Sequence, residues 1–232
     1  MRGRDVVHWG GDQVRIGPWR ADSGVALVAT MPERPPLSVA GVRHCLSILA
    51  HRGYRAAVTA ALEPREVQGF LGAGFTVKER LHLLGRALDD LPPQPAASLR
   101  RARRRDRAAV LALDARSFMP FWRLDEGALE DALGATPTTR FRVADDPGVA
   151  GYAITGCAGH RGYVQRLAVD PDHQGHGLGA ALLLDGLHWC RHRGASHAVV
   201  NTQEGNDTAL ALYEGFGFTR RPGGLAVLET EL

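Results

Sequence analysis

The chain has few cysteines, almost no lysine and no long apolar run, and each shortage excludes a class of protein. Its three cysteines, Cys45, Cys157 and Cys190, fit neither a disulfide framework nor a paired-thiolate zinc site, because they are odd in number and widely spaced. The net charge of +3 comes almost wholly from arginine, since Lys78 is the only lysine. Such a chain-wide bias does not indicate nucleic-acid binding. Apolar runs fall far short of the roughly 20 residues that span a bilayer, and no apolar signal segment follows Met1. We therefore expect a cytoplasmic protein with neither membrane nor nucleic acid as a partner.

One basic run, residues 100–107, tests that interpretation. It could be a targeting segment or a polyanion-binding patch. Ordinary strand-to-helix structure explains it better, because a helix with apolar residues at Val110, Leu113 and Phe118 follows directly. We expect a strand to end near this run and Asp106 to cap the helix.

The clearest break in the chain is the proline-rich segment 91–98. Three prolines in four positions block both helix continuation and strand pairing. With 44% hydrophobic residues over 232 positions, the chain can build a substantial core on each side of the break. The sequence predicts one domain over 1–93, a linker over 94–98 and a second domain over 99–232.

The two sides resemble one another. Each carries a His-Arg-Gly triplet, then a short apolar strand, then an aromatic residue followed by Gly-Phe-Thr. The glycines of the triplets, Gly53 and Gly194, are 141 residues apart, and the final phenylalanines, Phe75 and Phe218, are 143 apart. A chance match of short glycine-containing strings is the alternative. We interpret the chain as two related half-folds.

In the second half, strands and helices alternate around one central sheet. Period-two runs predict strands over 141–144, 149–156, 164–169, 198–202 and 225–230, with a turn at 145–148. Helix-spaced apolar residues predict helices over 177–192 and 208–213. The fold class is α/β (α+β), with a mixed sheet flanked by helices.

The segment from Leu167 to Ala180 is the most informative in the chain. A strand ends at Asp170, Pro171 blocks its extension, and three glycines at alternate positions lead into a helix. Glycine permits positive φ and close backbone approach. Free amides at a helix N-terminus favour a phosphate or pyrophosphate. Rossmann and P-loop proteins use similar turns, but no Gly-Lys-Ser/Thr is present and the domain starts long before this loop. A purely structural turn is the remaining alternative.

At this point the second half, about residues 98 to 232, resembles the GNAT acyltransferase superfamily. The family's pyrophosphate motif, Gln/Arg-x-x-Gly-x-Gly/Ala, is matched by Gln174, Gly177 and Gly179. Its Asn, Ala-x-x-Leu-Tyr and Gly-Phe signature is matched from Asn206 through Tyr213 to Phe218. The first half looks like a degenerate GNAT-like domain beside it.

The resemblance implies a role for each matched residue. Leu167, Ala168 and Val169 would lie along the pantetheine arm of acetyl-CoA like an added strand, and the N–H of Val169 would stabilise the oxyanion. Asn206 would contact the cofactor arm, and Tyr213 would be the general acid. The residues expected around the pyrophosphate are Gln174, Gly175, His176, Gly177, Leu178, Gly179 and Ala180.

The general base is where the chain departs from the family. Ribosomal-protein N-terminal acetyltransferases of this superfamily carry a glutamate five residues before the position of Asn206, and here that residue is Asn201. Other members place a base or a water-holding group along the strand before Leu167, where this chain has Tyr163 and Gln165. We favour a chain of water molecules; nearby candidates are Glu204, Asp170 and His160.

Two further patterns have ordinary explanations. His188 and His192 are four apart on a helix, which is a metal-competent spacing, but without a third ligand we expect a solvated face and no metal. The aromatic run 118–122 could form the acceptor-side wall that this superfamily usually builds there, or it could be plain core.

The first half is expected to have lost cofactor binding. Phe70 stands where the second half has Tyr213, so the acid hydroxyl is missing. The counterpart of the glycine loop, residues 32–41, contains prolines that lack the N–H groups a pyrophosphate needs.

These observations favour an acetyl-CoA-dependent N-acetyltransferase that acts on a primary amine. A CoA-binding regulatory or scaffold protein with little turnover is the main alternative, suggested by the missing base. Transfer of a longer acyl group, or of an aminoacyl group from aminoacyl-tRNA, is a third; the intact pyrophosphate loop disfavours the tRNA donor. The identity of the amine acceptor and the oligomeric state stay open.

Overall fold

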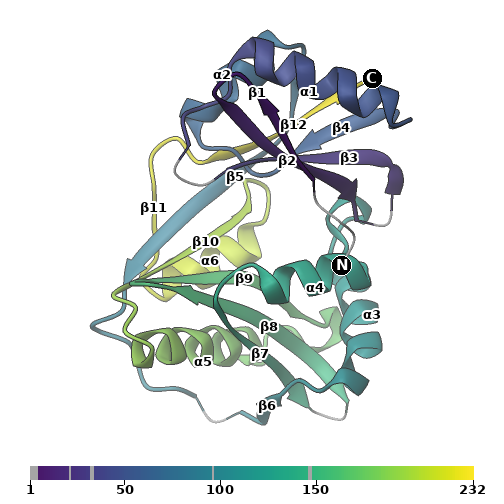
Figure 1. Ribbon diagram of the computed structural model, residues 1–232. Coiled ribbons are helices and arrows are strands. Elements are labelled where there is room, and N and C mark those ends of the chain that lie inside the picture. The colour runs from purple at the N-terminus through teal and green to yellow at the C-terminus, as the bar shows by residue number, and fades with distance from the viewer. Residues whose placement is uncertain (1–4, 21, 32–33, 96, 146–147) are drawn as a thin grey trace. The chain divides into compact units, whose positions relative to one another are not determined.

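In the computed structural model the chain divides into two compact units, each built around a β-sheet (Figure 1). The structure describes residues 5–20, 22–31, 34–95, 97–145 and 148–232. Unit 1 comprises the chain up to Leu83 together with Asn201–Asn206 and Arg220–Leu232. Unit 2 comprises Leu84–Val200 and Asp207–Thr219. This grouping follows contacts in space, so the division of the sequence at 94–98 stays a prediction.

Unit 1 is a mixed sheet in the order β1-β2-β3-β4-β12-β5. β3 and β4 pair in parallel, and the other pairings in this unit are antiparallel. Its elements are β1 (Asp5–Trp9), β2 (Asp12–Trp19), β3 (Asp22–Thr30), α1 (Val39–His51), β4 (Ala56–Thr59), α2 (Pro64–Gly72), the first part of β5 (Thr76–Ala87) and β12 (Leu225–Glu231). Both helices pack into one apolar cluster with the sheet, in which Leu49, Phe70 and Leu228 are buried.

The last strand forms where the sequence predicts it, but its partners lie in the first half of the chain. β12 pairs with β5 from Leu225 opposite Leu81 to Glu229 opposite Thr76, and its other edge pairs with β4. Leu228 is buried in the unit 1 core. The final residues of the chain therefore complete the sheet of unit 1.

Unit 2 has the sheet order β10-β9-β8-β7-β6, with the end of β5 beside β10. Its elements are β6 (Leu99–Arg101), η1 (Arg104–Asp106), α3 (Arg107–Ser117), η2 (Pro120–Trp122), α4 (Glu126–Gly134), β7 (Thr138–Asp145), β8 (Val149–Ala158), β9 (Arg161–Val169), η3 (Pro171–His173), α5 (Leu178–His192), β10 (His197–Gln203), α6 (Asp207–Gly215) and β11 (Thr219–Arg220). Only the first part of β10 belongs to unit 2. The short strand β11 pairs with β5, and its last residue belongs to unit 1.

Helices cover both faces of the unit 2 sheet. One face packs against α5, which buries Leu182, Leu183 and Leu187. The other packs against α3 and α4 around Val110 and Leu129 (Figure 1). The predicted α/β class with a mixed, helix-flanked sheet is confirmed. No helix in the described ranges is both long and apolar enough to cross a membrane.

The predicted elements of the second half are also confirmed, with boundaries that differ by a few residues. The turn expected at 145–148 includes residues 146–147, which lie outside the described ranges. The internal repeat recurs in the backbone. The C-cap residue of both α1 and α5 is an arginine, Arg52 and Arg193, and a glycine with positive φ follows each, +81° at Gly53 and +85° at Gly194. Each half also has a matching aromatic pair, Phe70 with Phe75 and Tyr213 with Phe218.

Asp106 stands at the start of α3, but its carboxylate does not cap the helix as the sequence suggests. It makes no cap hydrogen bond to α3 and turns back, accepting from Arg103 N–H at 2.7 Å. Two hydrogen bonds from the Arg100 guanidinium, at 2.7 and 3.0 Å, complete its environment. The local helix signal was therefore right about the position of Asp106 and wrong about its partner.

This pairing predicts an acid-dependent stability. The hydrogen bonds from Arg100 lower the pKa of Asp106 to about 2 although burial opposes the shift. A folded pKa below the unfolded value of about 3.9 gives stability that is fully present above about pH 4 and is lost as the pH falls toward 2. We expect Asp106→Asn to lower the free energy of unfolding at pH 7 and to match the unsubstituted protein increasingly closely below pH 4. Urea unfolding at several pH values measures this; a difference that does not change with pH would contradict it.

Candidate functional site

The candidate site is built around the second half of β9. β9 pairs in parallel with β10 only from Arg161 opposite His197 to Val164 opposite Val200. On its other edge it pairs with β8 as far as Val169. The register with β8 shifts between Ile154 and Thr155, so that Gln165 is the extra residue of a β-bulge. The bulge falls where the recorded pairing with β10 ends, which leaves one edge of β9 without a strand partner beyond it in the described chain.

The backbone groups on that edge can be assigned from the ladder. Asp170 N–H donates to the Ala150 carbonyl at 2.9 Å, and hydrogen-bonded positions recur at every second residue of an antiparallel ladder. Ala168 therefore bonds toward β8, whereas the N–H and C=O groups of Leu167 and Val169 point the other way. An extended ligand could pair with these groups as an added strand would.

A glycine turn joins this strand to α5. Gly175 and Gly177 have φ of +80° and +81°, a conformation that favours glycine, and added Cβ atoms there would meet nothing within 4 Å. Gly177 is the N-cap of α5 and supplies no side-chain cap. The N–H groups of Leu178, Gly179 and Ala180 open the first turn of the helix, where an anion is favoured.

Neighbouring side chains fix this turn. Gln174 Nε2 donates to the Val169 carbonyl at 3.2 Å. Asp170 accepts from Asp172 N–H at 3.2 Å and from Arg116. The hydrogen bond from Arg116 holds the pKa of Asp170 below its usual range. His176 is exposed in the turn.

Tyr213 lies on α6, close to the same strand and turn. Its side chain is 5% exposed and belongs to an apolar cluster against which Leu167 packs. Its neighbour Leu212 reaches the start of α5, since a Cβ on Gly179 would lie 3.4 Å from Leu212 Cδ2. Burial raises the pKa of Tyr213 to about 12, although the charge of Arg166 opposes the shift. The hydroxyl is therefore protonated throughout the neutral range.

Two asparagines flank the β10–α6 connection. Asn206 directly precedes α6, and its N–H donates to the Gln203 carbonyl at 3.0 Å. Asn201 is exposed in the last part of β10. Both fall in the segment grouped with unit 1.

The structure also reveals a buried ionic cluster that sequence analysis missed. Asp114 of α3 is 0% exposed and accepts from Arg166 Nε at 2.8 Å, Leu124 N–H at 2.7 Å and the Tyr152 hydroxyl. Arg166 Nη2 also donates to the Trp122 carbonyl at 2.7 Å. Two features of the sequence could have indicated this cluster: Asp114 lies next to the apolar positions of a helix, and Arg166 lies within an apolar strand.

The buried cluster shows how one member of the aromatic run 118–122 is packed. The Arg166 guanidinium lies 3.4 Å from the centroid of the Phe118 ring, which therefore packs over a buried cation. Met119, next to it, is 73% exposed. The run is thus neither wholly core nor wholly surface.

Position and environment distinguish the candidates for the general base. His160 lies in the turn before β9, at the opposite end of that strand from Val169. Because a strand rises about 3.3 Å per residue, His160 lies far from the glycine turn. Asp170 is ionised and engaged by Arg116, which makes it a weak base. Gln165 Nε2 donates to Thr136 Oγ1 at 3.3 Å, while its buried Oε1 has no partner among the described residues.

The remaining residues considered in the sequence are three cysteines and two histidines. The three cysteines are free and buried. His188 Nε2 lies 2.9 Å from the Pro92 carbonyl, and His192 Nδ1 lies 2.7 Å from the His188 carbonyl.

In unit 1 the counterpart of the glycine turn is occupied by the chain itself. Ser38 caps α1 by accepting from Gly41 N–H at 3.0 Å. Asp12 accepts from the Ser38 N–H and hydroxyl. A Cβ on Gly41 would lie 2.1 Å from Asp12 Oδ2, so this carboxylate sits directly against the first turn of α1. Residues 32–33 of the proline-rich counterpart lie outside the described ranges.

Comparison with known proteins gives concordant matches. The model of the Acetyltransferase (GNAT) family matches residues 107–218. A mycothiol acetyltransferase of Thermobispora bispora is 35% identical over 129 residues, which are 50% of this chain and 44% of that protein. One from Amycolatopsis mediterranei is 30% identical over 208 residues, 73% of this chain and 68% of that protein. The chain thus spans less than half the length of the first of these relatives.

Solved structures extend the likeness to both halves. A tandem GNAT protein from the clavulanic acid biosynthesis pathway has a TM-score of 0.68 and 18% identity, covering 97% of this chain and 81% of that chain. A GCN5-related N-acetyltransferase from Kribbella flavida has a TM-score of 0.65 and 17% identity, covering 99% and 90%. At these identities the likeness is one of fold.

Proposed function

This chain belongs to the GNAT acetyltransferase family, and we propose that it transfers an acetyl group from acetyl-CoA to a primary amine. One observation carries the proposal: the free edge of β9 leads directly into the glycine turn at the start of α5. A ligand with an extended polar arm and a pyrophosphate needs these two features side by side.

We propose that acetyl-CoA lies along this edge. The outward N–H and C=O groups of Leu167 would bond to the pantetheine amides, and Ala168 and Val169 would continue along the arm. The Val169 N–H is kept for the oxyanion, because the Val169 C=O already accepts from Gln174. The first turn of α5 would hold the pyrophosphate through N–H groups, with positive φ at Gly175 and Gly177 shaping the turn. Asn206 would contact the cofactor arm, as the family resemblance implies.

The reaction requires a neutral amine, an oxyanion donor and stabilisation of the leaving thiolate. The amine attacks the thioester carbonyl, and the N–H of Val169 bonds to the oxyanion. When the tetrahedral intermediate collapses, the C–S bond breaks, the C–N bond is retained and the thiolate accepts a proton.

We propose a hydrogen-bonding role for Tyr213, in place of the full general-acid role that the family resemblance implies, because of the environment of its hydroxyl. A thiol with a pKa of about 8.5 is a stronger acid than Tyr213, whose pKa is raised to about 12. Complete proton transfer from Tyr213 to the thiolate is therefore unfavourable at equilibrium. Tyr213 instead donates a hydrogen bond to the developing thiolate, and the proton lost by the attacking amine restores the balance.

Removal of the amine proton is assigned to water. Asn201 cannot accept a proton at neutral pH, and Asp170 is a weak base because the hydrogen bond from Arg116 holds its pKa below the usual range. Gln165 is the bulge residue, and its Oε1, which has no partner among the described residues, would hold the first water molecule of the chain. Mycothiol-related amines are the first acceptors to test, because several relatives carry the name mycothiol acetyltransferase.

Unit 1 is proposed to bind no acetyl-CoA. Asp12 and Ser38 occupy the first turn of α1, where the second half would hold an anion, and the Asp12 carboxylate would repel one. Phe70 replaces the tyrosine. The role of unit 1 is then structural.

A CoA-binding protein with little turnover is the second candidate, and Asn201 favours it. Both candidates need the glycine turn, so binding alone does not separate them. Turnover with an amine acceptor, and its loss in a Tyr213 variant, does.

Calorimetric titration with acetyl-CoA and with CoA tests the donor half of the proposal. We expect one site per chain and loss of binding in Gly177→Val, because valine disfavours φ near +81° and would place a branched side chain over the first turn. Gly179→Ala is the matched control, since its Cβ meets only ordinary contacts. Absence of binding in the unsubstituted protein would refute the proposal, and two sites per chain would show that unit 1 is active.

A further inference from the structure

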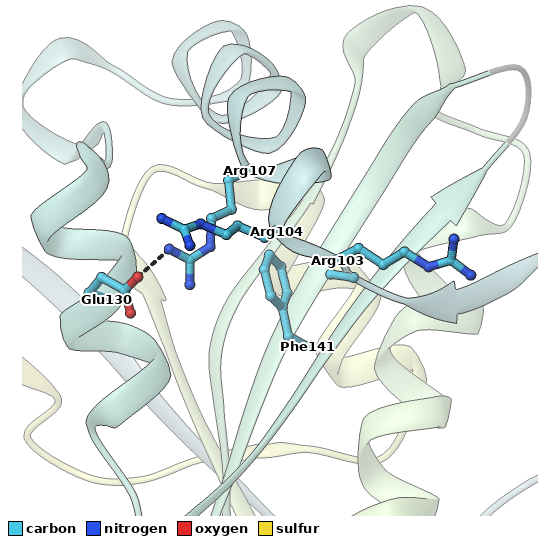
Figure 2. A pocket seen from close by; sticks show the side chains of 6 residues that line it. Arg103, Arg104, Arg107, Glu130 and Phe141 are labelled. Carbon is cyan, nitrogen blue, oxygen red and sulfur yellow. Dashed lines mark hydrogen bonds and ion pairs between the residues drawn. The ribbon is translucent and has the colours of Figure 1, made fainter.

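A second candidate ligand site lies in unit 2, away from β9. It is a cavity of about 400 Å³ where β6 passes through η1 into α3. Its lining residues are Ala102, Arg103, Arg104, Arg107, Glu130 and Phe141. Figure 2 shows the Arg104 and Arg107 side chains extending side by side toward Glu130, with the Phe141 ring below them and Arg103 pointing away. None of these residues belongs to the proposed acetyl-CoA site.

The cavity has more positive charge than its own carboxylate can balance. Glu130 forms an ion pair with Arg107. Arg104 is exposed and has no ion-pair partner in the described part of the chain. Two guanidinium groups beside a single carboxylate, which pairs with only one of them, leave positive charge for another anion.

Three other arginines of the neighbourhood are already paired with carboxylates. Arg100, in the same basic run, is held by Asp106 and Asp145. A neighbouring cavity of about 450 Å³ on the same strand includes Arg140 and Arg142, but both pair with Asp185. The cavity differs from these three sites because Glu130 pairs with Arg107, while Arg104 has no carboxylate partner among the described residues.

The shape of the cavity narrows the ligand class. Planar guanidinium groups match the oxygens of a phosphate in a two-point hydrogen-bonding geometry. Phe141 provides an aromatic wall against which a flat apolar group can pack. A volume of about 400 Å³ lies in the range of small-molecule pockets. A long polyanion would call for an extended basic groove, and here Arg100, Arg140 and Arg142 are paired with carboxylates.

We propose that this cavity binds a phosphate monoester with an aromatic or apolar body. Arg104 and Arg107 hold the phosphate, and Phe141 packs against the organic part. Arg107 can keep Glu130 on one side and donate to the phosphate on the other, since a guanidinium has five N–H donors. The inference does not depend on acetyl transfer and would stand if that proposal failed.

The test uses phenyl phosphate as the probe, titrated calorimetrically into the full chain, with phenol and inorganic phosphate as partial ligands. We expect phenyl phosphate to bind more tightly than either partial ligand and more weakly as salt increases. Arg104→Gln should weaken binding by about tenfold or more, because it removes a charged hydrogen-bond donor. Arg104→Lys should restore only part of the loss, because it keeps the charge and not the planar fork.

Two control variants separate the possible sources of a signal. Arg105→Gln removes an exposed arginine of the same run that does not line the cavity, and it should change affinity by no more than about twofold. Gly177→Val, which disables the proposed pyrophosphate turn, should leave phenyl phosphate binding unchanged.

Four outcomes would overturn the proposal. These are absence of phenyl phosphate binding at millimolar concentration, equal losses in Arg104→Gln and Arg105→Gln, loss in Gly177→Val alone, and equal affinity for phenol and phenyl phosphate. A DNA duplex that binds tightly and depends equally on Arg104 and Arg105 would identify a nucleic-acid surface instead.

Discussion

Replacing Tyr213 by phenylalanine is expected to lower turnover by about 10²- to 10³-fold while acetyl-CoA binding stays within about twofold of the unsubstituted protein. The hydroxyl is protonated across the neutral range because burial raises its pKa to about 12. Its hydrogen bond matters only when negative charge develops on the leaving sulfur. An interaction made chiefly in the transition state lowers kcat without weakening the ground-state complex.

Steady-state kinetics with an amine acceptor and calorimetric binding of CoA measure the two halves of this prediction. The ratio of rates between the two proteins should stay constant from about pH 6 to pH 10, because Tyr213 does not titrate in that window. Tyr54→Phe, which packs against the core of unit 1, is the control for loss of a tyrosine hydroxyl outside the proposed site. An unchanged kcat in Tyr213→Phe would remove this residue from the mechanism and favour the binding-protein alternative.

Asp114→Ala is expected to lower the free energy of unfolding of unit 2 by about 3–5 kcal/mol. The carboxylate is fully buried and accepts hydrogen bonds from Arg166, the Leu124 N–H and the Tyr152 hydroxyl. Removing it leaves the guanidinium of Arg166 in the interior without its counter-ion. The cost is large because an uncompensated buried charge is far less favourable than an exposed one.

Urea unfolding followed by hydrogen exchange in β8 and β9 assigns the effect to unit 2. Glu130→Ala is the control, because it breaks a partly exposed ion pair with Arg107 that is worth about 0–1 kcal/mol. Asp114→Asn should fall between the two, since it loses the charge and keeps an acceptor for the Leu124 N–H. Equal destabilisation by Asp114→Ala and Glu130→Ala would mean that the buried cluster adds nothing beyond a surface pair.

The two halves of the chain differ most where an anion would bind. In the second half Gly175 and Gly177 open the turn before α5, and Gly177 supplies no side-chain cap. In the first half Ser38 and Asp12 satisfy the start of α1 from within the chain. The same fold position thus has one helix end free for a ligand and one already occupied by a carboxylate, which is consistent with a single acetyl-CoA per chain.

The sequence by itself determined the local elements and the repeat. Apolar spacing identified α5, and the glycines after α1 and α5 located the C-terminal end of the helix in each copy of the repeat. The strand–turn–helix run from Leu167 to Ala180 indicated the candidate site. These features depend on residues within a few positions of one another, so a single sequence contains the information that sets them.

Only the tertiary structure decided which distant residues meet. It paired β12 with β4 and β5, buried Asp114 against Arg166 and set Asp12 against α1. It also placed Arg104 and Arg107 around one carboxylate. Such contacts join segments tens of residues apart, and their free energy depends on burial and on the full set of neighbouring charges, which the order of residues along the chain does not specify.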